Sequence, residues 1–173
     1  LNEPDEWTVG DSLVARAKPE TDFWRETNDS GIRHNGHFLF ASVSGDFRAR
    51  VKLTGQYNTQ YDQAGIMVLA SEYTWLKCGI ELLDGRQRAS SVVTRNCSDW
   101  SVTALENPTS VWIQCERSGA TATIHYSLDG NHYELMRKTF LTNEAALEVG
   151  LMFAAPKGNG FDILFEDFLL TSS

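Results

Sequence analysis

Cysteine is scarce in this sequence, and its spacing matches no metal site. The three cysteines, Cys78, Cys97 and Cys115, are an odd number and form no C-x-x-C pair. Neither a disulfide framework nor a zinc site is therefore expected. Cys78 and Cys115 have mostly apolar neighbours two positions away, which is typical of small core residues rather than of nucleophiles. This cysteine usage favours a reducing compartment, and we expect a cytoplasmic protein.

Basic residues and long apolar runs are also missing. Fifteen lysines and arginines stand against 23 aspartates and glutamates, which gives a formal net charge of -8. A surface of this sign repels phosphate backbones and anionic lipid headgroups, so we expect neither nucleic acid nor a membrane as a partner. No apolar run approaches the ~18 residues that cross a bilayer, and the first residues form neither a basic start nor an apolar signal segment. We therefore expect a soluble protein.

Helical periodicity is missing as well, because apolar residues recur two positions apart rather than three and four. In residues 47–53, four apolar side chains alternate with Arg48, Arg50 and Lys52, so one face of this strand is expected in the core and the other in solvent. The segment 141–147 is the one place where we expect a short helix or a helical turn. Similar patterns predict strands over residues 13–17, 37–43, 64–70, 76–83, 90–94, 111–115, 121–128, 134–139, 148–154 and 161–170.

The predicted strands are short and end at turn residues such as Asp84-Gly85 and Asp129-Gly130. Strands at roughly 8–12-residue spacing favour a sandwich or a closed barrel over an arrangement of alternating strands and helices. A length of 173 residues is enough for one sizeable core. We therefore expect residues 1–173 to form a single domain.

Six short segments resemble those of a known family: Thr21-Asp22-Phe23-Trp24, Tyr61-Asp62-Gln63-Ala64-Gly65, Trp75-Leu76-Lys77-Cys78-Gly79-Ile80-Glu81, Ser91-Val92-Val93-Thr94, Ser98-Asp99-Trp100-Ser101 and Tyr126-Ser127-Leu128-Asp129-Gly130. Together they resemble an uncharacterised family, a domain of unknown function in the concanavalin A-like lectin/glucanase superfamily, which includes the fungal regulator of enolase protein. Similar domains are appended to family 43 glycoside hydrolases. The resemblance implies an all-β, two-sheet antiparallel jelly-roll sandwich with a concave face, on which superfamily members hold sugars. It implies no activity.

The strand over residues 76–83 and the residue before it carry the first candidates for a site. Alternation places Trp75, Lys77, Gly79 and Glu81 on one face, which we expect to be solvent-exposed, opposite an apolar face. Glycine inside a strand often marks the close approach of a ligand or of another backbone. Lys77 and Glu81 are therefore candidates for ligand binding, the alternative being a bulge or an ordinary exposed face.

Polar residues in neighbouring segments extend this candidate site. Gln63 shares a face with Gly65, which places a carboxamide beside bare backbone, as sugar hydroxyl recognition requires. Asp62 either joins the site or caps a turn through the backbone. Thr94 either lines the site or serves only as a strand former.

Aromatic residues and one histidine complete the set of candidates. Trp24, Trp75 and Trp100 are candidates for stacking on a pyranose ring, because the apolar face of a sugar packs on an indole; tryptophan is at least as often a core residue. The four histidines match no metal-ligand spacing, and we expect no metal. Only His37, at a strand start near the Trp24 loop, is placed at the site.

Catalysis is not favoured by the carboxylates that the sequence offers. Glycosidases need two carboxylates flanking one bond, and the Glu-x-Asp-x-Glu strand of the superfamily's glucanases is absent. Glu81 with Asp62 or Asp99, on separate strands, is the pair that remains. Phosphate loops and dinucleotide fingerprints are absent as well, and we expect no cofactor.

We therefore expect a carbohydrate-recognition domain that binds a sugar or another small polar ligand on its concave sheet. Two alternatives stay open: a glycosidase-like enzyme that uses Glu81 and Asp62, and an intracellular regulator that binds a metabolic enzyme. The expected site combines polar residues of the concave face with three residues at its rim: Asp62, Gln63, Lys77, Glu81 and Thr94 on the face, and Trp24, His37 and Trp100 at the rim.

Overall fold

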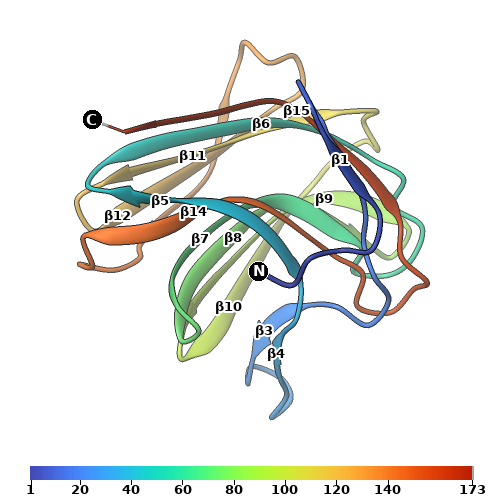
Figure 1. The fold of residues 1–173 in the computed structure, drawn as a ribbon, viewed down its shortest axis with the longest axis horizontal. Coiled ribbons are helices and arrows are strands. Elements are labelled where there is room, and N and C mark those ends of the chain that lie inside the picture. Colours follow the sequence, from blue (N-terminus) through green and yellow to red (C-terminus); the bar gives the residue numbers. More distant parts are fainter. Residues whose placement is uncertain (173) are drawn as a thin grey trace.

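The computed structural model describes residues 1–172, which form two stacked β-sheets and a small hairpin (Figure 1). The seven-stranded sheet has the order β1 (Trp7–Val9), β2 (Leu13–Arg16), β15 (Asp162–Ser172), β6 (Phe47–Gly55), β11 (Val111–Ser118), β12 (Thr121–Ser127) and β13 (Glu134–Phe140). The six-stranded sheet has the order β10 (Cys97–Ala104), β9 (Arg86–Arg95), β8 (Thr74–Leu83), β7 (Gln63–Ser71), β14 (Ala146–Ala154) and β5 (His37–Ser44). The hairpin consists of β3 (Phe23–Arg25) and β4 (Ile32–His34). The predicted all-β jelly-roll sandwich is confirmed.

The main core fills the space between the two sheets. In β6, Ala49 and Val51 are fully buried and Arg48 is exposed, as the alternation in the sequence predicts. The facing sheet contributes Ile66 of β7 and Leu76 of β8, which belong to the same apolar cluster. The period of two therefore identifies the core side of both sheets.

The short helix predicted over residues 141–147 is wrong. The segment leaves β13 as an irregular connection and enters β14 at Ala146, and residues 1–172 contain no helix at all. Leu141 and Leu147 are both buried in the main core. In an α-helix, the side chains of Leu141 and Leu147, six residues apart, would point about 120° away from each other. An extended chain therefore brings both side chains to the core more directly. Residues 1–172 therefore contain no helix that is long and apolar enough to span a membrane.

A second apolar cluster lies on the outer, concave side of the six-stranded sheet, where the hairpin covers it. Figure 1 shows β3 and β4 beneath the curved sheet. Phe23 of the hairpin is fully buried and packs edge-on against Trp75, with the ring centroids 6.2 Å apart. The remaining members of the cluster are Phe38, Met67, Leu69, Val92 and Met152. Of the two roles considered for Trp75, stacking on a sugar or packing in the core, the structure shows the core.

The hairpin also changes the environment of the polar residues of β8. Lys77 and Glu81 do share one face, as predicted, but they are only 5% and 8% exposed. The expectation of a solvent-facing surface is wrong because β3 and its flanking loops cover part of the sheet. What remains open beside the hairpin is a pocket.

Candidate ligand-binding pocket

A pocket of about 850 Å³ lies between the concave sheet and hairpin β3–β4. Five of the eight predicted site residues line it: Gln63 of β7, Lys77 and Glu81 of β8, Trp100 of β10 and Trp24 of β3. The other lining residues come mostly from loops and from the hairpin: Asp22, Thr27, Asn28, Asp29, Arg33, Tyr61, Val92, Ser98, Asp99, Pro156 and Lys157.

Strand register explains why residues far apart in the sequence meet at the floor of the pocket. Gln63 lies directly opposite Glu81 across the β7–β8 ladder. On the other side, Lys77 pairs with Val92 of β9, and Val92 pairs with Trp100 of β10. Cross-strand partners lie on the same face of a sheet. The sheet therefore presents an amide, an ammonium, a carboxyl and an indole side by side.

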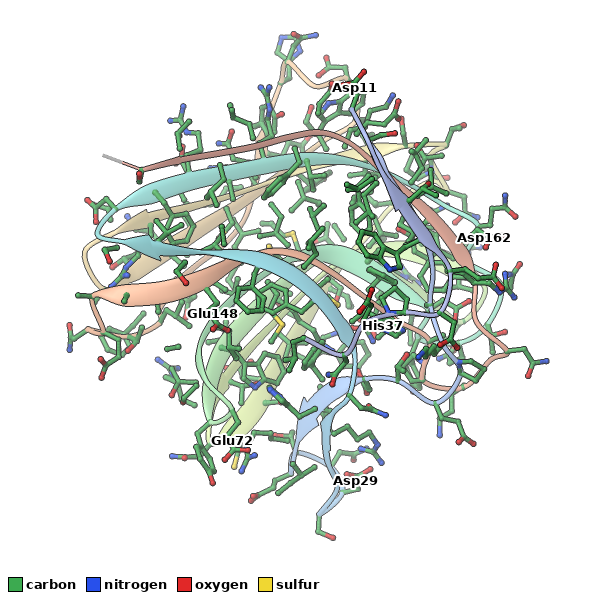
Figure 2. The ribbon with its side chains drawn as sticks, viewed as in Figure 1. Asp11, Asp29, His37, Glu72, Glu148 and Asp162 are labelled. Carbon is green, nitrogen blue, oxygen red and sulfur yellow. The ribbon has the colours of Figure 1, made fainter. Side chains whose placement is uncertain are left out.

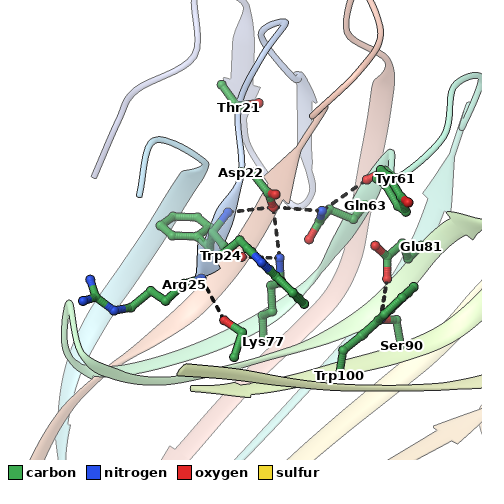
Figure 3. A network of polar contacts seen from close by, with 12 residues as sticks. Thr21, Asp22, Trp24, Arg25, Tyr61, Gln63, Lys77, Glu81, Ser90 and Trp100 are labelled. Carbon is green, nitrogen blue, oxygen red and sulfur yellow. Dashed lines mark hydrogen bonds and ion pairs between the residues drawn. The ribbon is translucent and has the colours of Figure 1, made fainter. Parts of the chain in front are cut away.

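Asp22, just before β3, connects the hairpin to this floor (Figure 3). The Lys77 ammonium donates to Asp22 Oδ1 at 3.1 Å and to the carbonyl oxygen of Phe23 at 2.6 Å. The Gln63 amide donates to the same Asp22 oxygen and to the carbonyl oxygen of Tyr61, both at 3.2 Å. A buried ammonium is strongly unfavourable without such partners. The ion pair therefore fixes the hairpin over the sheet.

Glu81 forms a separate group with Ser90 and Trp100. The Ser90 hydroxyl donates to Glu81 Oε2 at 2.6 Å, and the Trp100 indole donates to the same oxygen at 2.9 Å. Burial raises the pKa of Glu81 and the nearby Asp22 charge adds to this, while Lys77 and the two hydrogen bonds oppose it. Oε1 accepts no hydrogen bond from residues 1–172, and Figure 3 shows it on the side of the carboxyl group away from Trp100.

Three aromatic rings form part of the pocket wall. The Trp100 ring lies edge-on to both Trp24 and Tyr61, with centroid distances of 6.5 Å in each case. Trp100 is 37% exposed, and the Trp24 indole donates to the carbonyl oxygen of Thr27. The indole N–H groups of Trp100 and Trp24 are therefore both bonded within the protein, and the Trp100 ring remains accessible.

Asp62 lies outside the pocket, fully buried on the other side of the chain from Gln63. Its Oδ2 accepts the backbone N–H groups of Asn58 and Thr59 at 2.8 and 2.9 Å. Burial raises the pKa of Asp62, and these two hydrogen bonds oppose the shift. Of the two roles considered for Asp62, the structure shows the turn cap.

Thr94 and His37 also lie outside the pocket. Thr94 is on the concave face but is fully buried, with its hydroxyl 2.9 Å from that of Ser98. His37 accepts the backbone N–H of Lys18 through Nε2, and its Nδ1 lies 2.5 Å from the carbonyl oxygen of Asn2. Figure 2 shows His37 inside the molecule, beside the N-terminal segment. Neither residue is placed to contact a ligand in this pocket, because protein segments already cover both.

The most important pocket residue without an assigned role in the sequence analysis is Asp22. It occurs in one of the segments that resemble the family, but its role depends on a hairpin whose strands have three residues each. The part of the charged rim that the hairpin supplies was missed for the same reason, whereas Lys157 lies in the loop between β14 and β15. At this rim, Arg33 pairs with Asp29 at 3.2 Å, while Lys157 is exposed. Short strands carry too little alternation to be recognised.

Gly65 and Gly79 are needed for backbone packing. They are directly opposite each other across the β7–β8 ladder. A Cβ on Gly65 would lie 1.9 Å from the carbonyl oxygen of Cys78, and one on Gly79 would lie 2.0 Å from that of Ala64. These distances are far below van der Waals contact. Of the alternatives for the strand glycines, the structure shows close approach of another backbone.

Metal binding has no structural support in the described chain. Across residues 1–172, no three histidine, cysteine, aspartate or glutamate side chains are grouped as metal ligands. The chemistry that the pocket offers is hydrogen bonding, stacking and charge.

Comparisons with solved structures agree with this fold. The chain superposes on the crystal structure of a functionally unknown protein from Saccharomyces cerevisiae with a TM-score of 0.96 and 34% identity, covering 100% of this chain and 95% of the other. It also resembles the GH43 protein BlXynB from Bacillus licheniformis, with a TM-score of 0.73 and 17% identity over 99% of this chain but only 36% of the other. An alginate lyase from Klebsiella pneumoniae matches with a TM-score of 0.62 and 12% identity over 98% and 85% of the two chains. The last two similarities show the fold alone.

Sequence comparisons identify the family. The Saccharomyces cerevisiae protein named "Regulation of enolase protein 1" is 38% identical over 175 residues, covering 99% of this chain and 88% of the relative. The model of a family described as "Protein of unknown function (DUF1349)" matches residues 1–173. The resemblance inferred from the six segments is thereby confirmed, and the chain belongs to the DUF1349 family.

Proposed function

We propose that this chain is a carbohydrate-recognition domain that binds a sugar in the pocket between the concave sheet and hairpin β3–β4. The observation that carries the proposal is the convergence of Gln63, Lys77, Glu81 and Trp100 in that one pocket. Three strands contribute these residues, and core packing alone does not require polar groups there. Such convergence of polar groups in a concave site is typical of ligand binding.

The size and lining of the pocket support a sugar. Small-molecule pockets have volumes of about 300–1,000 Å³, and this one has about 850 Å³. The Trp100 indole is exposed and its N–H is bonded to Glu81, so its ring is available to pack on the apolar face of a pyranose. Glu81 Oε1 and the Lys77 ammonium are placed to hydrogen-bond hydroxyl groups, and such charge-assisted bonds are strong.

A panel of sugars tests the proposal by thermal shift. A ligand at 100 times its Kd stabilises the folded state by about 2.7 kcal/mol, which corresponds to a Tm increase of about 5–10 °C for a domain of this size. Glu81→Gln is expected to reduce this shift for the sugar that binds. Glu106→Gln, an exposed residue outside the pocket, is the matched control and is expected to keep it. If no sugar of the panel raises the Tm of the chain, and the Tm of Glu81→Gln in the presence of the sugars behaves in the same way, the proposal is refuted.

Glycoside hydrolysis is a second candidate, favoured by two carboxyl groups in different environments within the pocket. Asp22 is paired with the Lys77 ammonium, whereas burial raises the pKa of Glu81. A carboxyl with a raised pKa suits the role of general acid, which points to Glu81. Turnover of nitrophenyl glycosides that is lost in Glu81→Gln and kept in Asp62→Asn would support this candidate. Absence of turnover by a protein that binds sugars would exclude it for those substrates.

A metabolic enzyme as partner is a third candidate, and it rests on the name of the yeast relative, "Regulation of enolase protein 1". The three free cysteines support a reducing compartment such as the cytoplasm, where this chain and a metabolic enzyme would meet. On the outer face of the seven-stranded sheet, Lys52 of β6 is paired to Glu166 at 3.0 Å, and apolar side chains such as Val14 of β2 are exposed as well. Direct titration of purified enolase into the chain tests this candidate. Binding above the level seen with an unrelated acidic protein would support it.

A further inference from the structure

We propose that the pocket selects neutral, hydroxyl-rich sugars and discriminates against acidic ones. This inference rests on the proposed function and specifies its ligand class. It follows from which hydrogen-bonding groups of the floor are already satisfied within the protein and which remain for a ligand.

The donors of the floor are almost all in use. The Gln63 amide group has two hydrogens and makes two bonds, to Asp22 Oδ1 and to the carbonyl oxygen of Tyr61. The Ser90 hydroxyl and the Trp100 indole both donate to Glu81. Lys77 uses two of its three hydrogens. One ammonium hydrogen is therefore the main donor left at the floor.

Acceptors, in contrast, remain available. Glu81 Oε1, Asp22 Oδ2 and Gln63 Oε1 accept no hydrogen bond from the described residues 1–172. None of the three belongs to the buried unpartnered atoms of this part of the chain, so they are accessible to a ligand. Acceptor oxygens thus outnumber free donors at the floor, and a matching ligand must supply hydrogens.

Hydroxyl groups and carboxylates differ in this respect. A hydroxyl donates one hydrogen and also accepts, whereas an ionised carboxylate only accepts. A sugar hydroxyl therefore satisfies Glu81 Oε1 or Asp22 Oδ2 and also suits the remaining Lys77 hydrogen. A ligand carboxylate at the floor would face those oxygens with no hydrogen between them. When Glu81 carries a proton, its carboxyl can donate one hydrogen, but Asp22 Oδ2 and Gln63 Oε1 still only accept.

The floor also has no uncompensated positive charge for an acidic ligand. The Lys77 ammonium is 3.1 Å from the Asp22 carboxylate, and both side chains are largely buried. At the rim, Arg33 is paired with Asp29 at 3.2 Å. Lys157 is exposed, and attraction to an exposed charge is weakened by solvent and salt. The cations around the pocket therefore give an anion little stabilisation at the floor.

A cationic ligand is the main competing class. The edge-on rings of Trp24, Tyr61 and Trp100, together with carboxyl oxygens, are features that bind ammonium groups elsewhere. The Lys77 ammonium, however, already forms part of the same floor. The Asp22 carboxylate is already paired with that ammonium, and burial disfavours the charged form of Glu81, so a second cation would find little uncompensated negative charge there. The structure consequently favours an uncharged ring with several hydroxyl groups.

Titration of the full chain with matched sugars tests the inference. The probes are methyl glucoside, methyl xyloside, methyl glucuronide and methyl glucosaminide, with Kd measured by ligand-observed NMR. Methyl glucuronide is expected to bind at least about tenfold more weakly than the better neutral sugar, a difference of about 1.4 kcal/mol. Glu81→Gln, whose amide offers a donor in place of an acceptor, is expected to narrow this ratio. Glu106→Gln is expected to leave it unchanged.

The possible outcomes separate this inference from the proposed function. If methyl glucuronide binds as tightly as the neutral sugars or more tightly, the inference is overturned and sugar recognition stands. Preferential binding of methyl glucosaminide overturns it in favour of a cationic ligand. If none of the four sugars binds, and a wider panel also gives no response, the proposed function fails and the inference fails with it. Melting curves of both variants confirm that they are folded.

Discussion

Removing one partner of the ion pair between Asp22 and Lys77 should strongly destabilise the fold, because the pair fixes hairpin β3–β4 to the concave sheet. The two side chains are 15% and 6% exposed, with Lys77 Nζ 3.1 Å from Asp22 Oδ1. Removing one partner of a buried pair destabilises a protein by about 3–5 kcal/mol, because the other charge is left buried. In Asp22→Ala, Lys77 keeps the carbonyl oxygen of Phe23 at 2.6 Å, so we expect the low end of this range, about 3 kcal/mol.

Thermal unfolding measures this effect directly. For a domain of 150–250 residues, about 1 kcal/mol corresponds to about 2–4 °C in Tm, so Asp22→Ala is expected to lower Tm by about 6–12 °C. Asp22→Asn keeps the acceptor oxygen and loses the charge, and its decrease should be smaller. Asp11→Ala, an exposed aspartate, is the matched control and should change Tm by at most about 2 °C.

A double-mutant cycle with Lys77→Met separates the ion pair from general loss of packing. Once the ammonium is gone, Asp22→Ala leaves no unpaired buried cation and should be much less destabilising than in the wild-type background. The expected coupling energy lies in the range of about 0.5–3 kcal/mol found for residues in contact. If the two substitutions are additive, or if Asp22→Ala behaves like Asp11→Ala, the reasoning about the hairpin is refuted.

Three further predictions concern single residues. Burial raises the pKa of Glu81, so its carboxyl stabilises the fold most below its unfolded pKa of about 4.3 and least above its folded pKa. The Tm of Glu81→Gln relative to that of the wild type should therefore be higher at pH 7 than at pH 4. An equal Tm difference at the two pH values would contradict this. Gly79→Ala places a Cβ 2.0 Å from the carbonyl oxygen of Ala64 and should destabilise by at least about 1–3 kcal/mol in urea titrations, whereas Gly10→Ala, with open space around it, should not. Cys97 is exposed and the other two thiols are buried, so a thiol reagent should modify one cysteine in the folded protein, and fast modification of a second thiol would be inconsistent with the fold.

The sequence predicted the sandwich well because its strands are long enough to show alternation. The period of two in β6 and β8 identified the buried faces and placed Lys77 and Glu81 together. The same reasoning could not find β3 and β4, which have three residues each. Without the hairpin, the concave face was expected to be open, and the burial of Lys77, Glu81 and Thr94 was not anticipated.

Local polarity alone could not separate pocket residues from structural ones. Asp62 and Gln63 are neighbours in the sequence, yet one caps a turn and the other lines the pocket. His37 is polar and near the Trp24 segment in the sequence, but its ring nitrogens contact the backbone of residues 2 and 18. These assignments depend on which segments pack together in three dimensions. Side-chain type and alternation do not specify that.

The most direct test of the account observes the five tryptophan indole N–H signals in an NMR titration with the sugars of the panel. Trp100 and Trp24 line the pocket, so their signals should shift, Trp100 most because its N–H is bonded to Glu81. The signals of Trp75, which is fully buried, and of Trp7 and Trp112, which lie outside the pocket, should stay in place. Shifts confined to Trp7 or Trp112, or an unchanged Trp100 signal at saturating sugar, would contradict the claim that this pocket recognises sugars.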